Sequence, residues 1–233
     1  AMDDPGNIYM TGRFNSPSIT FGGATLTNAG GMDMYVVKYD LDGNVLWAKS
    51  AGGTGFDGGK SVAVDVLGNS FIVGSFSSSS ITFGTASFPN SGEVDMYIVK
   101  YDPDGNILWA RDAGGINADV VNGIAVDESG NSSIVGIFTS PSITFGTNTL
   151  TNVGSNWNIF LVKYAENGNV LGAKRSGGIS GDLAYSIDLD SAGNGYMVGQ
   201  FSSSPLIFGS DTLTTVGLHD MFIAKLRDGI TDV

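Results

Sequence analysis

Cysteine is missing from this sequence of 233 residues, which excludes disulfides, thiolate metal sites and cysteine nucleophiles. Basic residues are scarce: 11 Lys and Arg stand against 23 Asp and Glu, a formal net charge of −12. Because phosphate backbones and anionic membrane surfaces repel such a chain, we expect no nucleic-acid partner. No apolar run approaches the roughly 18 residues that span a bilayer, and neither end has a signal-peptide layout, so we expect a soluble, mature segment without membrane insertion.

What the sequence has instead is a repeat. The segment from Asp33 to Gly53, DMYVVKYDLDGNVLWAKSAGG, returns at residues 95–115 with 16 of 21 positions identical. Residues 158–178 form a third copy, and Asp220 begins a fourth that stops short. The spacing is 62, 63 and 62 residues, measured between Lys38, Lys100, Lys163 and Lys225. A fixed period in this range is typical of a solenoid, a propeller or an array.

Each copy contains short segments rich in Val, Ile, Tyr and Phe and bounded by Gly, Asn, Asp and Ser, which predicts four strands and no helix. In copy two the first two strands are predicted at residues 60–65 and 69–76. In copy one the last two are predicted at 33–40 and 44–50, after a longer connection that holds ITFG and TLTN. Glycine at the fourth place of the tight turns, as in Asp40 to Asn44, predicts hairpins closed by a type I turn and a bulge.

Several strands are apolar on both faces: Met34 and Val36 alternate with Tyr35 and Val37. Such a strand needs protein against each face. Four-stranded sheets stacked around an axis provide it, so we predict an all-β fold, a β-propeller of repeated four-stranded antiparallel blades. The tight turns are then expected on one face of the disc and the long connections on the other, where binding is expected.

We predict a single domain, residues 1–233, with repeats at 1–59, 60–121, 122–184 and 185–233, the last incomplete. The first copy keeps only a fragment of its first strand, and the last copy lacks its fourth strand after Gly229. We therefore expect part of a larger propeller, or a ring completed by remaining blades or further chains. A closed four-bladed ring is the lesser alternative.

The pattern D-x-x-G-N-x-Y/F-x-x-G, then ITFG, then D-M/I-Y/F-V-x-K-Y-D-x-D-G-N-x-L-W-A covers nearly the whole chain. It resembles the bacterial SBBP-type β-propeller repeat. The resemblance implies a propeller and a bacterial setting outside the cytoplasm, secreted or on the cell surface, and it implies no single activity and no catalytic residues. Copy three departs from the pattern with Ala165 for the Asp and Gly172 for the Trp, so those positions are not indispensable to a blade.

Three aspartates in equivalent places of the Gly-rich connection between the fourth and first strands are candidate ligand-binding residues: Asp57, Asp119 and Asp182. Glycines let a ligand approach the backbone, and a carboxylate accepts hydrogen bonds from sugar hydroxyls or helps to hold a hard cation. The alternative is an aspartate that caps its own loop. The tight turns do not match a calcium loop, because Gly43 falls at position 4 counted from Asp40. No cofactor or metal is therefore predicted, and calcium stays an alternative that the loop spacing does not support.

The place just before the third strand varies among the copies and holds Met32, Val94, Trp157 and His219. Varying residues on a fixed frame favour recognition, and Trp157 is suited to stack on a sugar ring or an apolar side chain. Relaxed packing at a loop edge is the alternative. His219 has no accompanying Ser-His-Asp signal and is interpreted as a loop residue and not a general base.

The recurrent lysines lie inside apolar strands, and recurrent aspartates end the first strands at Asp3, Asp65, Asp127 and Asp190. Because a buried Lys needs a partner, a repeated structural ion pair is favoured over a functional ring of basic groups.

Three functions fit this sequence. The first is a non-enzymatic binding and scaffold propeller with protein or glycan ligands, in which near-identical units give multivalency. The second is a structural spacer or assembly module of an extracellular protein or filament. The third is an enzyme that acts on polysaccharides through paired carboxylates. Repetition disfavours the enzyme, because an active site usually breaks symmetry at one place.

Overall fold

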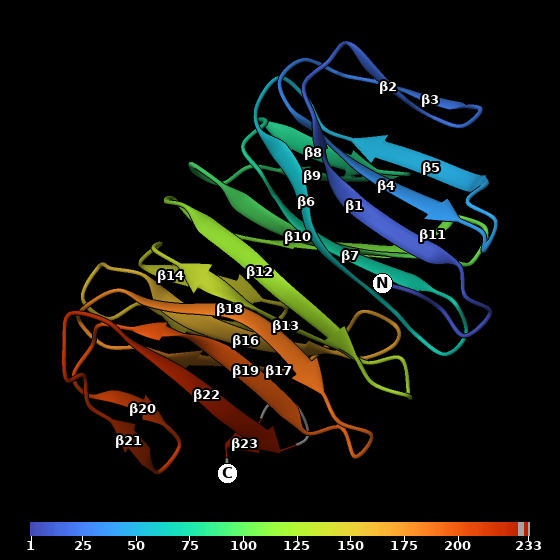
Figure 1. The fold of residues 1–233 in the computed structure, drawn as a ribbon. Coiled ribbons are helices and arrows are strands. Elements are labelled where there is room, and N and C mark those ends of the chain that lie inside the picture. The colour runs from blue at the N-terminus through green and yellow to red at the C-terminus, as the bar shows by residue number, and fades with distance from the viewer. Residues whose placement is uncertain (228–230, 233) are drawn as a thin grey trace.

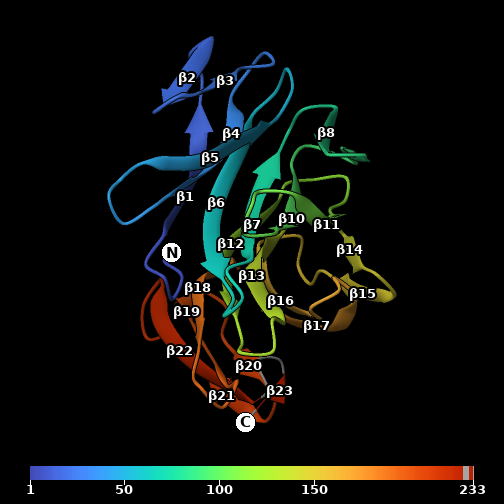
Figure 2. The ribbon, with the colours of Figure 1, turned by 90° about the vertical axis from the view of Figure 1, so that its right-hand side faces the viewer.

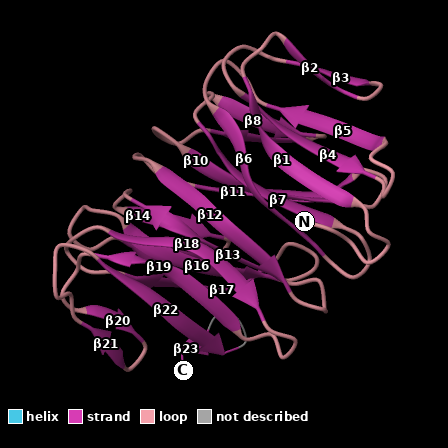
Figure 3. Ribbon diagram, in the orientation of Figure 1, coloured by secondary structure: helices cyan, strands magenta, loops and turns pink. Residues whose placement is uncertain are grey.

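All regular structure in the described residues is β-strand (Figure 3). The computed structural model describes residues 1–227 and 231–232, and their strands form four large antiparallel sheets, which we call blades 1 to 4. The strands of blade 1 are β1 (Ile8–Phe14), β4 (Asp33–Tyr39) and β5 (Val45–Ala51); those of blade 2 are β6 (Asp57–Val64), β7 (Ser70–Phe76), β10 (Asp95–Tyr101) and β11 (Ile107–Ala113); those of blade 3 are β12 (Asp119–Val126), β13 (Ser132–Phe138), β16 (Asn158–Tyr164) and β17 (Val170–Ser176); those of blade 4 are β18 (Asp182–Leu189), β19 (Gly195–Phe201), β22 (Asp220–Arg227) and β23 (Thr231–Asp232).

The blades stack face to face in chain order and form an open arc, with blade 1 and blade 4 at its two ends (Figure 1). β6 lies against β1 on one side and β12 on the other, and β12 lies against β18. A view turned by 90° shows these first strands toward the middle of the molecule (Figure 2). The all-β fold with repeated four-stranded antiparallel sheets is therefore confirmed, and the stack has the form of propeller blades.

Both faces of a central blade are buried, as the apolar pattern predicts. We call the face toward the next blade in chain order the forward face, and the opposite one the back face. Met96 and Ile98 on the forward face of blade 2 pack with Phe160 and Val162 on the back face of blade 3. Each such side chain contributes about 1.5–3 kcal/mol when it is fully buried, so stacking between blades is a major source of stability.

The connection between the second and third strand of each blade is not the plain loop we expected. It folds into a small hairpin in every blade: β2 (Ser18–Phe21) with β3 (Ala24–Thr27), β8 (Ser80–Phe83) with β9 (Ala86–Pro89), β14 (Ser142–Phe145) with β15 (Asn148–Thr151), and β20 (Leu206–Phe208) with β21 (Asp211–Leu213). The signal was present in ITFG: Ile81 and Phe83 alternate with an exposed Thr82 and are buried, and Gly84 turns the chain at a φ of +61°.

Two further expectations about strands need correction. The first strand of blade 2 begins at Asp57, before the predicted residue 60, because glycines 58 and 59 pair with β7 ahead of a bulge. The repeat boundary at residue 60 therefore falls inside β6. Blade 4 also has the beginning of a fourth strand, since Thr231 pairs with Arg227 and Asp232 pairs with Leu226.

The start of the chain extends blade 1 as the repeat predicts. Met2 bridges Ile8, and the amide of Tyr9 donates to the carbonyl of Ala1 at 2.9 Å. Residues 1–3 therefore occupy the edge that β6 occupies in blade 2.

Candidate functional site

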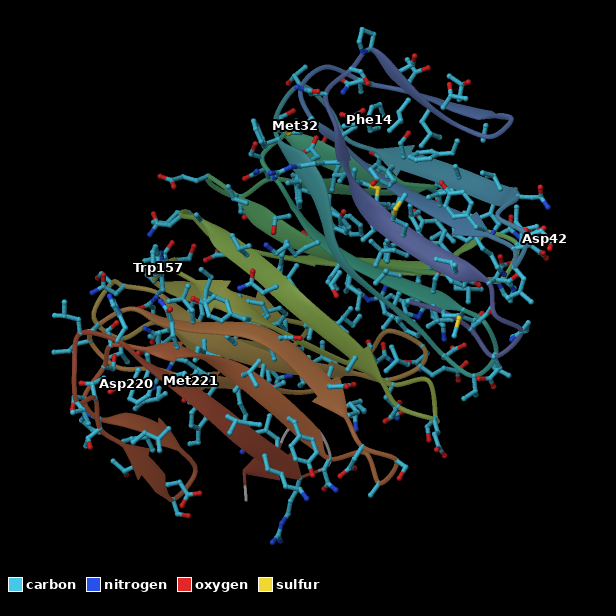
Figure 4. The ribbon with its side chains drawn as sticks, in the orientation of Figure 1. Phe14, Met32, Asp42, Trp157, Asp220 and Met221 are labelled. Atoms are coloured by element: carbon cyan, nitrogen blue, oxygen red, sulfur yellow. The ribbon has the colours of Figure 1, made fainter. Side chains whose placement is uncertain are left out.

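The tight turns and the long connections lie on opposite sides of the stack (Figure 4). Asp42 marks the turn side, and Met32 and Trp157 mark the other, which we call the loop face. In the turn from Asp40 to Asn44, Gly43 has a φ of +80° and a bulge follows Lys38. Hydrogen bonds from the side chain and backbone of Asn44 hold the pKa of Asp40 below its usual range. The predicted hairpin geometry is confirmed, and the Asp40 carboxylate is used in closing the turn.

Three of the four recurrent lysines form structural ion pairs, as predicted. The fourth, Lys225, is exposed and lies over the ring of Tyr196. Lys38 lies 3.7 Å from Asp3, Lys100 lies 3.5 Å from Asp65, and Lys163 lies 3.3 Å from Asp127. Lys38, Lys100 and Lys163 are buried. These charges therefore serve the fold and do not face a ligand.

Two of the lysines also tie a blade to the next one. Lys38 Nζ donates to the carbonyl of Pro103 at 3.1 Å, and the indole Nε1 of Trp47 donates to the same oxygen at 3.0 Å. One blade further on, Lys100 and Trp109 both donate to the carbonyl of Glu166, at 3.5 and 2.8 Å. We call this arrangement the Lys–Trp latch. It explains the recurring Trp as a residue of the blade junction.

On the loop face, the three predicted aspartates hold the junction between one blade and the next. The carboxylate of Asp57 accepts hydrogen bonds from the amides of Gly53, Ser77 and Ser78 at 2.7, 3.2 and 3.1 Å, and from the Ser78 hydroxyl. All three aspartates are fully buried. This is the loop-capping geometry that we gave as the alternative, so a ligand would reach these carboxylates only by displacing protein donors.

The same clamp is repeated at the next two junctions. Asp119 accepts from the amides of Thr139 and Ser140 and from the Ser140 hydroxyl, at 3.0, 3.1 and 2.7 Å. Asp182 accepts from the amides of Ser202 and Ser203 at 3.1 and 3.0 Å, and from the Ser203 hydroxyl. We call each set an aspartate clamp.

Sequence reasoning missed the serine partners of the clamps. Each serine follows the second strand of its blade, some 20 residues along the chain from its aspartate, so no local pattern joins them. A signal was available in the repeat, because Ser78, Ser140 and Ser203 recur at equivalent places with Ser or Thr before each.

A second carboxylate lies beside each of the first two clamps. Asp33 and Asp95 are buried, and the Oδ1 atom of each has no hydrogen-bond partner among the described residues. Burial raises the pKa of Asp33, and Asp57 raises it further. Burial also raises the pKa of Asp95, with added repulsion from Asp119 and Asp112. These positions therefore favour a neutral side chain.

Copy three has that neutral side chain. Asn158 stands at the place of Asp33 and Asp95, and its Nδ2 donates to the carbonyls of Val153 and Gly178 at 3.2 and 3.3 Å. Arg175 Nη1 donates to Asn158 Oδ1 at 3.1 Å. Asn158 Oδ1 also accepts from the amide of Val153 at 3.1 Å, as Oδ2 of Asp33 and of Asp95 accepts from the equivalent amide. At the third junction an amide nitrogen with protein acceptors therefore replaces the carboxylate oxygen that the first two leave unpaired.

The variable residues before the third strand meet the clamps. The amides of Asp57, Asp119 and Asp182 donate to the carbonyls of Met32, Val94 and Trp157, at 2.7, 2.8 and 2.9 Å. The Trp157 side chain is 48% exposed, Met32 is half-buried, and exposed His219 shares a short hydrogen bond with the Ser202 hydroxyl. The structure therefore brings Met32 to Asp57 and Trp157 to Asp182. His219 of blade 4 also reaches the third clamp, because it contacts Ser202, whose amide donates to Asp182.

Large apolar side chains stand exposed beside the clamps. Phe56 directly precedes Asp57, whereas Ile116 and Ile179 come three residues before their aspartates. With Trp157, these four residues are all exposed, and we call them the loop-face row. At least one of these exposed apolar side chains therefore lies at each of the three junctions, which offers apolar contacts along the loop face. The clamps fix the backbone under this row.

A groove of about 1100 Å³ lies elsewhere, along the outer strands of blades 1 and 2. Its lining includes Lys49, Trp109, Arg111 and Glu166 and none of the six predicted ligand-binding residues. The described residues hold no cluster of three or more metal-ligating side chains. They also hold no helix long and apolar enough to cross a bilayer.

No protein-family model matches the chain, so the resemblance to the SBBP-type repeat stays a prediction. An uncharacterized WD repeat-containing protein, L264, of Acanthamoeba polyphaga mimivirus is 28% identical over an alignment of 233 residues. The match covers 84% of this chain and 17% of the relative. The regulatory protein FlaEY of Caulobacter vibrioides is 28% identical over 171 residues, covering 70% of this chain and 17% of the relative. The chain thus spans about a sixth of the length of these curated relatives. WD repeats fold as propeller blades, in agreement with the stacked sheets.

Proposed function

We propose that this chain is a non-enzymatic scaffold of propeller blades that binds protein partners on its loop face. The observation that carries the proposal is the loop-face row of Phe56, Ile116, Trp157 and Ile179, exposed above buried aspartate clamps. A rigid backbone lowers the entropic cost of binding, since few loop conformations have to be lost. The similarity to a WD repeat-containing protein supports a repeat scaffold in general terms.

Charge indicates the chemistry of the partner. The chain carries a formal net charge of −12, which repels acidic proteins and steers basic ones toward it. An apolar row on an acidic chain fits a partner surface that combines apolar side chains with surrounding Lys or Arg. Following the SBBP-type resemblance, we place this function in a bacterial protein that is secreted or displayed on the cell surface.

The buried state of the carboxylates argues against the enzyme hypothesis. A glycosidase needs two carboxyl groups that face the scissile bond. Asp33 and Asp57, which influence each other electrostatically, are both buried, and Asp57 is saturated with protein donors. The same environment recurs at Asp95 and Asp119, so it belongs to the architecture of the junctions.

Glycan recognition is the second candidate function, and the exposed indole of Trp157 favours it. Aromatic rings stack on the apolar faces of sugar rings and leave the hydroxyls free to bond with loop groups. Near-identical junctions would add multivalency toward a repetitive polymer.

The proposal is tested by panning the immobilised protein against a phage-displayed random-peptide library and, in parallel, by probing a glycan array with and without a chelator. We expect peptides that combine basic and apolar residues. Their affinity should fall roughly tenfold or more in Trp157→Ala and Ile116→Ala. Leu67→Ala is the matched control, because Leu67 is exposed in a tight turn and should leave binding unchanged.

Equal binding by all three variants would contradict a loop-face site. Glycan binding that is lost only in Trp157→Ala would favour the second candidate over the first.

A further inference from the structure

The outer strand of blade 2 is an open sheet edge that lies in a groove. β11 is the last strand of its sheet and pairs only with β10 among the described residues. The groove of about 1100 Å³ is lined by seven consecutive residues of this segment, 105–111. Because neighbouring side chains of a strand point to opposite faces, a lining by consecutive residues places the groove along the edge and not over one face. Such an edge is a template on which an extended chain can add a strand.

The walls of the groove come from all three of the first blades. Blade 1 contributes Lys49 and Ser50 of β5, blade 2 contributes residues 82–86 of its small hairpin, and blade 3 contributes Glu166 and Asn167 of its tight turn. The volume exceeds the roughly 300–1,000 Å³ that small ligands occupy. The groove can therefore hold a segment of polypeptide.

The groove offers positive charge on an acidic chain. Lys49 and Arg111 stand at equivalent places of β5 and β11, and both line the groove. Neither has an ion-pair partner in the part of the chain that the structure describes. Glu166 is the one carboxylate of the lining, and its Oε1 lies 3.8 Å from Lys100 Nζ. Two cations are thus available for the carboxylates of a partner.

The Arg111 guanidinium is held in place at this edge. Its Nη1 donates to the carbonyl of Ala110 at 2.7 Å, and its Cζ lies 5.7 Å from the centroid of the Trp109 ring. Leu108, which also lines the groove, is 52% exposed. The edge therefore combines a fixed cation with an apolar side chain.

A basic residue on an edge strand also protects that edge from unwanted pairing. Lys174 stands at the same place of β17, so protection explains why the basic residue recurs. It does not explain the groove, because the cavity that Lys174 and Ser176 line has only about 50 Å³. The difference between β11 and β17 therefore points to a role for the groove that the repeat does not require.

We propose that an extended acidic segment of a partner protein binds in this groove as an added strand beside β11. Its backbone pairs with the free edge, its carboxylates meet Lys49 and Arg111, and an apolar side chain packs on Leu108. Because the chain has a net charge of −12, an acidic segment is repelled elsewhere on the surface, which favours the groove. The site goes beyond the loop face and takes a partner segment of the opposite charge.

Fluorescence anisotropy of a labelled synthetic peptide in which Glu alternates with Val tests the proposal. We expect saturable binding, and roughly tenfold weaker binding or less when Lys replaces each Glu. Two further peptides carry N-methyl groups on one or the other set of alternate amides. Only one set faces β11 in an added strand, so one of these two peptides should lose binding and the other should keep it.

Three variants of the protein locate the site. Lys49→Glu and Arg111→Glu should each weaken binding of the Glu–Val peptide roughly tenfold. Lys60→Glu is the matched control, because it makes the same change of charge at an exposed position of β6 that does not line the groove. Lys49 is exposed, so its variant tests the site even if Arg111→Glu disturbs the packing on Trp109.

Hydrogen exchange shows which edge is covered. The bound peptide should slow exchange in β11 and leave β17 unchanged. Equal weakening by Lys49→Glu and Lys60→Glu would overturn the groove as the site, and unaltered binding of both N-methylated peptides would overturn the added strand. An absence of binding up to about 1 mM peptide would overturn the proposal as a whole.

This test is independent of the loop-face proposal. Trp157→Ala and Ile116→Ala change the loop face and should leave binding of the Glu–Val peptide unchanged, since neither residue lines the groove. Failure of one proposal is therefore distinguishable from failure of the other.

Discussion

The junctions of blade 1 with blade 2 and of blade 2 with blade 3 differ from the junction of blade 3 with blade 4. The first two carry the Lys–Trp latch on the carbonyls of Pro103 and Glu166. The third has Gly172 in place of the indole. It keeps the apolar contact, with Ile159 and Leu161 in one core cluster with Met197 and Phe222, and it keeps the aspartate clamp at Asp182.

The difference teaches which parts of the repeat are indispensable. Apolar stacking and the clamp are present at all three junctions, so they define how one blade sits on the next. The latch adds hydrogen bonds that hold neighbouring blades together on the turn side. Since the Trp is one of the most conspicuous residues of the repeat, its absence at one junction shows that a recurring aromatic need not mark a binding site.

The largest expected effect comes from removing the latch cation. Lys100→Met leaves buried Asp65 without its partner, and breaking a buried pair in this way costs about 3–5 kcal/mol. Urea unfolding at a concentration where the chain is monomeric measures the loss. Lys49→Met, at an exposed position of β5, is the control and should change the free energy of unfolding by less than about 0.5 kcal/mol. Equal effects of the two changes would contradict a structural role for Lys100.

A smaller loss is expected from Trp109→Gly, which gives the second junction the residue of the third. The indole packs beside Phe71 and Tyr164, with ring centroids 5.9 and 6.2 Å away, and Nε1 donates to the carbonyl of Glu166. Because the side chain is only partly buried, we expect a cost near the lower end of the range for large aromatic truncations, about 3 kcal/mol. Thermal unfolding measures it, with Leu108→Ala at the neighbouring exposed position as the control. A Trp109→Gly protein as stable as the control would show that the latch contributes nothing.

Gly168 lies against the indole of Trp109 in the same latch. An added Cβ at Gly168 would fall 2.7 Å from the indole of Trp109, and the residue has a φ of +78°. The turn glycine is thus required both by the hairpin and by the latch.

The smallest effect is expected from Asp95→Asn, which gives the second junction the neutral side chain of the third. This substitution should change how the free energy of unfolding depends on pH. The folded pKa of Asp95 is raised by burial, so its contribution to stability is present in acid and is lost as the pH rises through that folded pKa. Asp95→Asn removes this loss. The variant should therefore be more stable than the unmodified protein at neutral pH, and the difference should shrink as the pH falls toward the usual aspartate range.

Asp40→Asn is the control with the opposite sign. Hydrogen bonds from Asn44 lower the folded pKa of Asp40, so its contribution is present at neutral pH and is lost as the pH falls through that lowered value. Asp40→Asn should destabilise at neutral pH and converge with the unmodified protein in acid. Guanidinium unfolding over a pH series measures both profiles, and parallel profiles for the two variants would contradict the assignment.

Much of the fold could be predicted from the sequence because its features are local and repeated. The alternation of Met34 and Val36 with Tyr35 and Val37 indicated burial on both faces, and the glycine of each tight turn predicted its positive φ. The hairpins were missed because each strand is at most four residues long, which is the shortest run in which alternation indicates a strand. The early start of β6 was missed because glycine is unfavourable in strands.

The candidate site was less predictable, because it depends on contacts between distant residues. Asp57, Asp119 and Asp182 were recognised as equivalent, but their burial depends on serines in another loop. The exposed Ile116 and Ile179 carried no signal as a pair, since each stands alone in a Gly-rich segment.

Hydrogen exchange of the native protein, followed by mass spectrometry at a concentration where the chain is monomeric, tests the central claim that stability comes from one recurring blade junction. Blades 2 and 3 are packed on both faces. Among the residues that the structure describes, blade 4 has no partner at Met221 and Ile223, and it meets blade 3 without the indole. The account predicts that β19 and β22 open at a lower free energy than β7, β10, β13 and β16. Uniform protection of all four blades, lost in a single step, would contradict it.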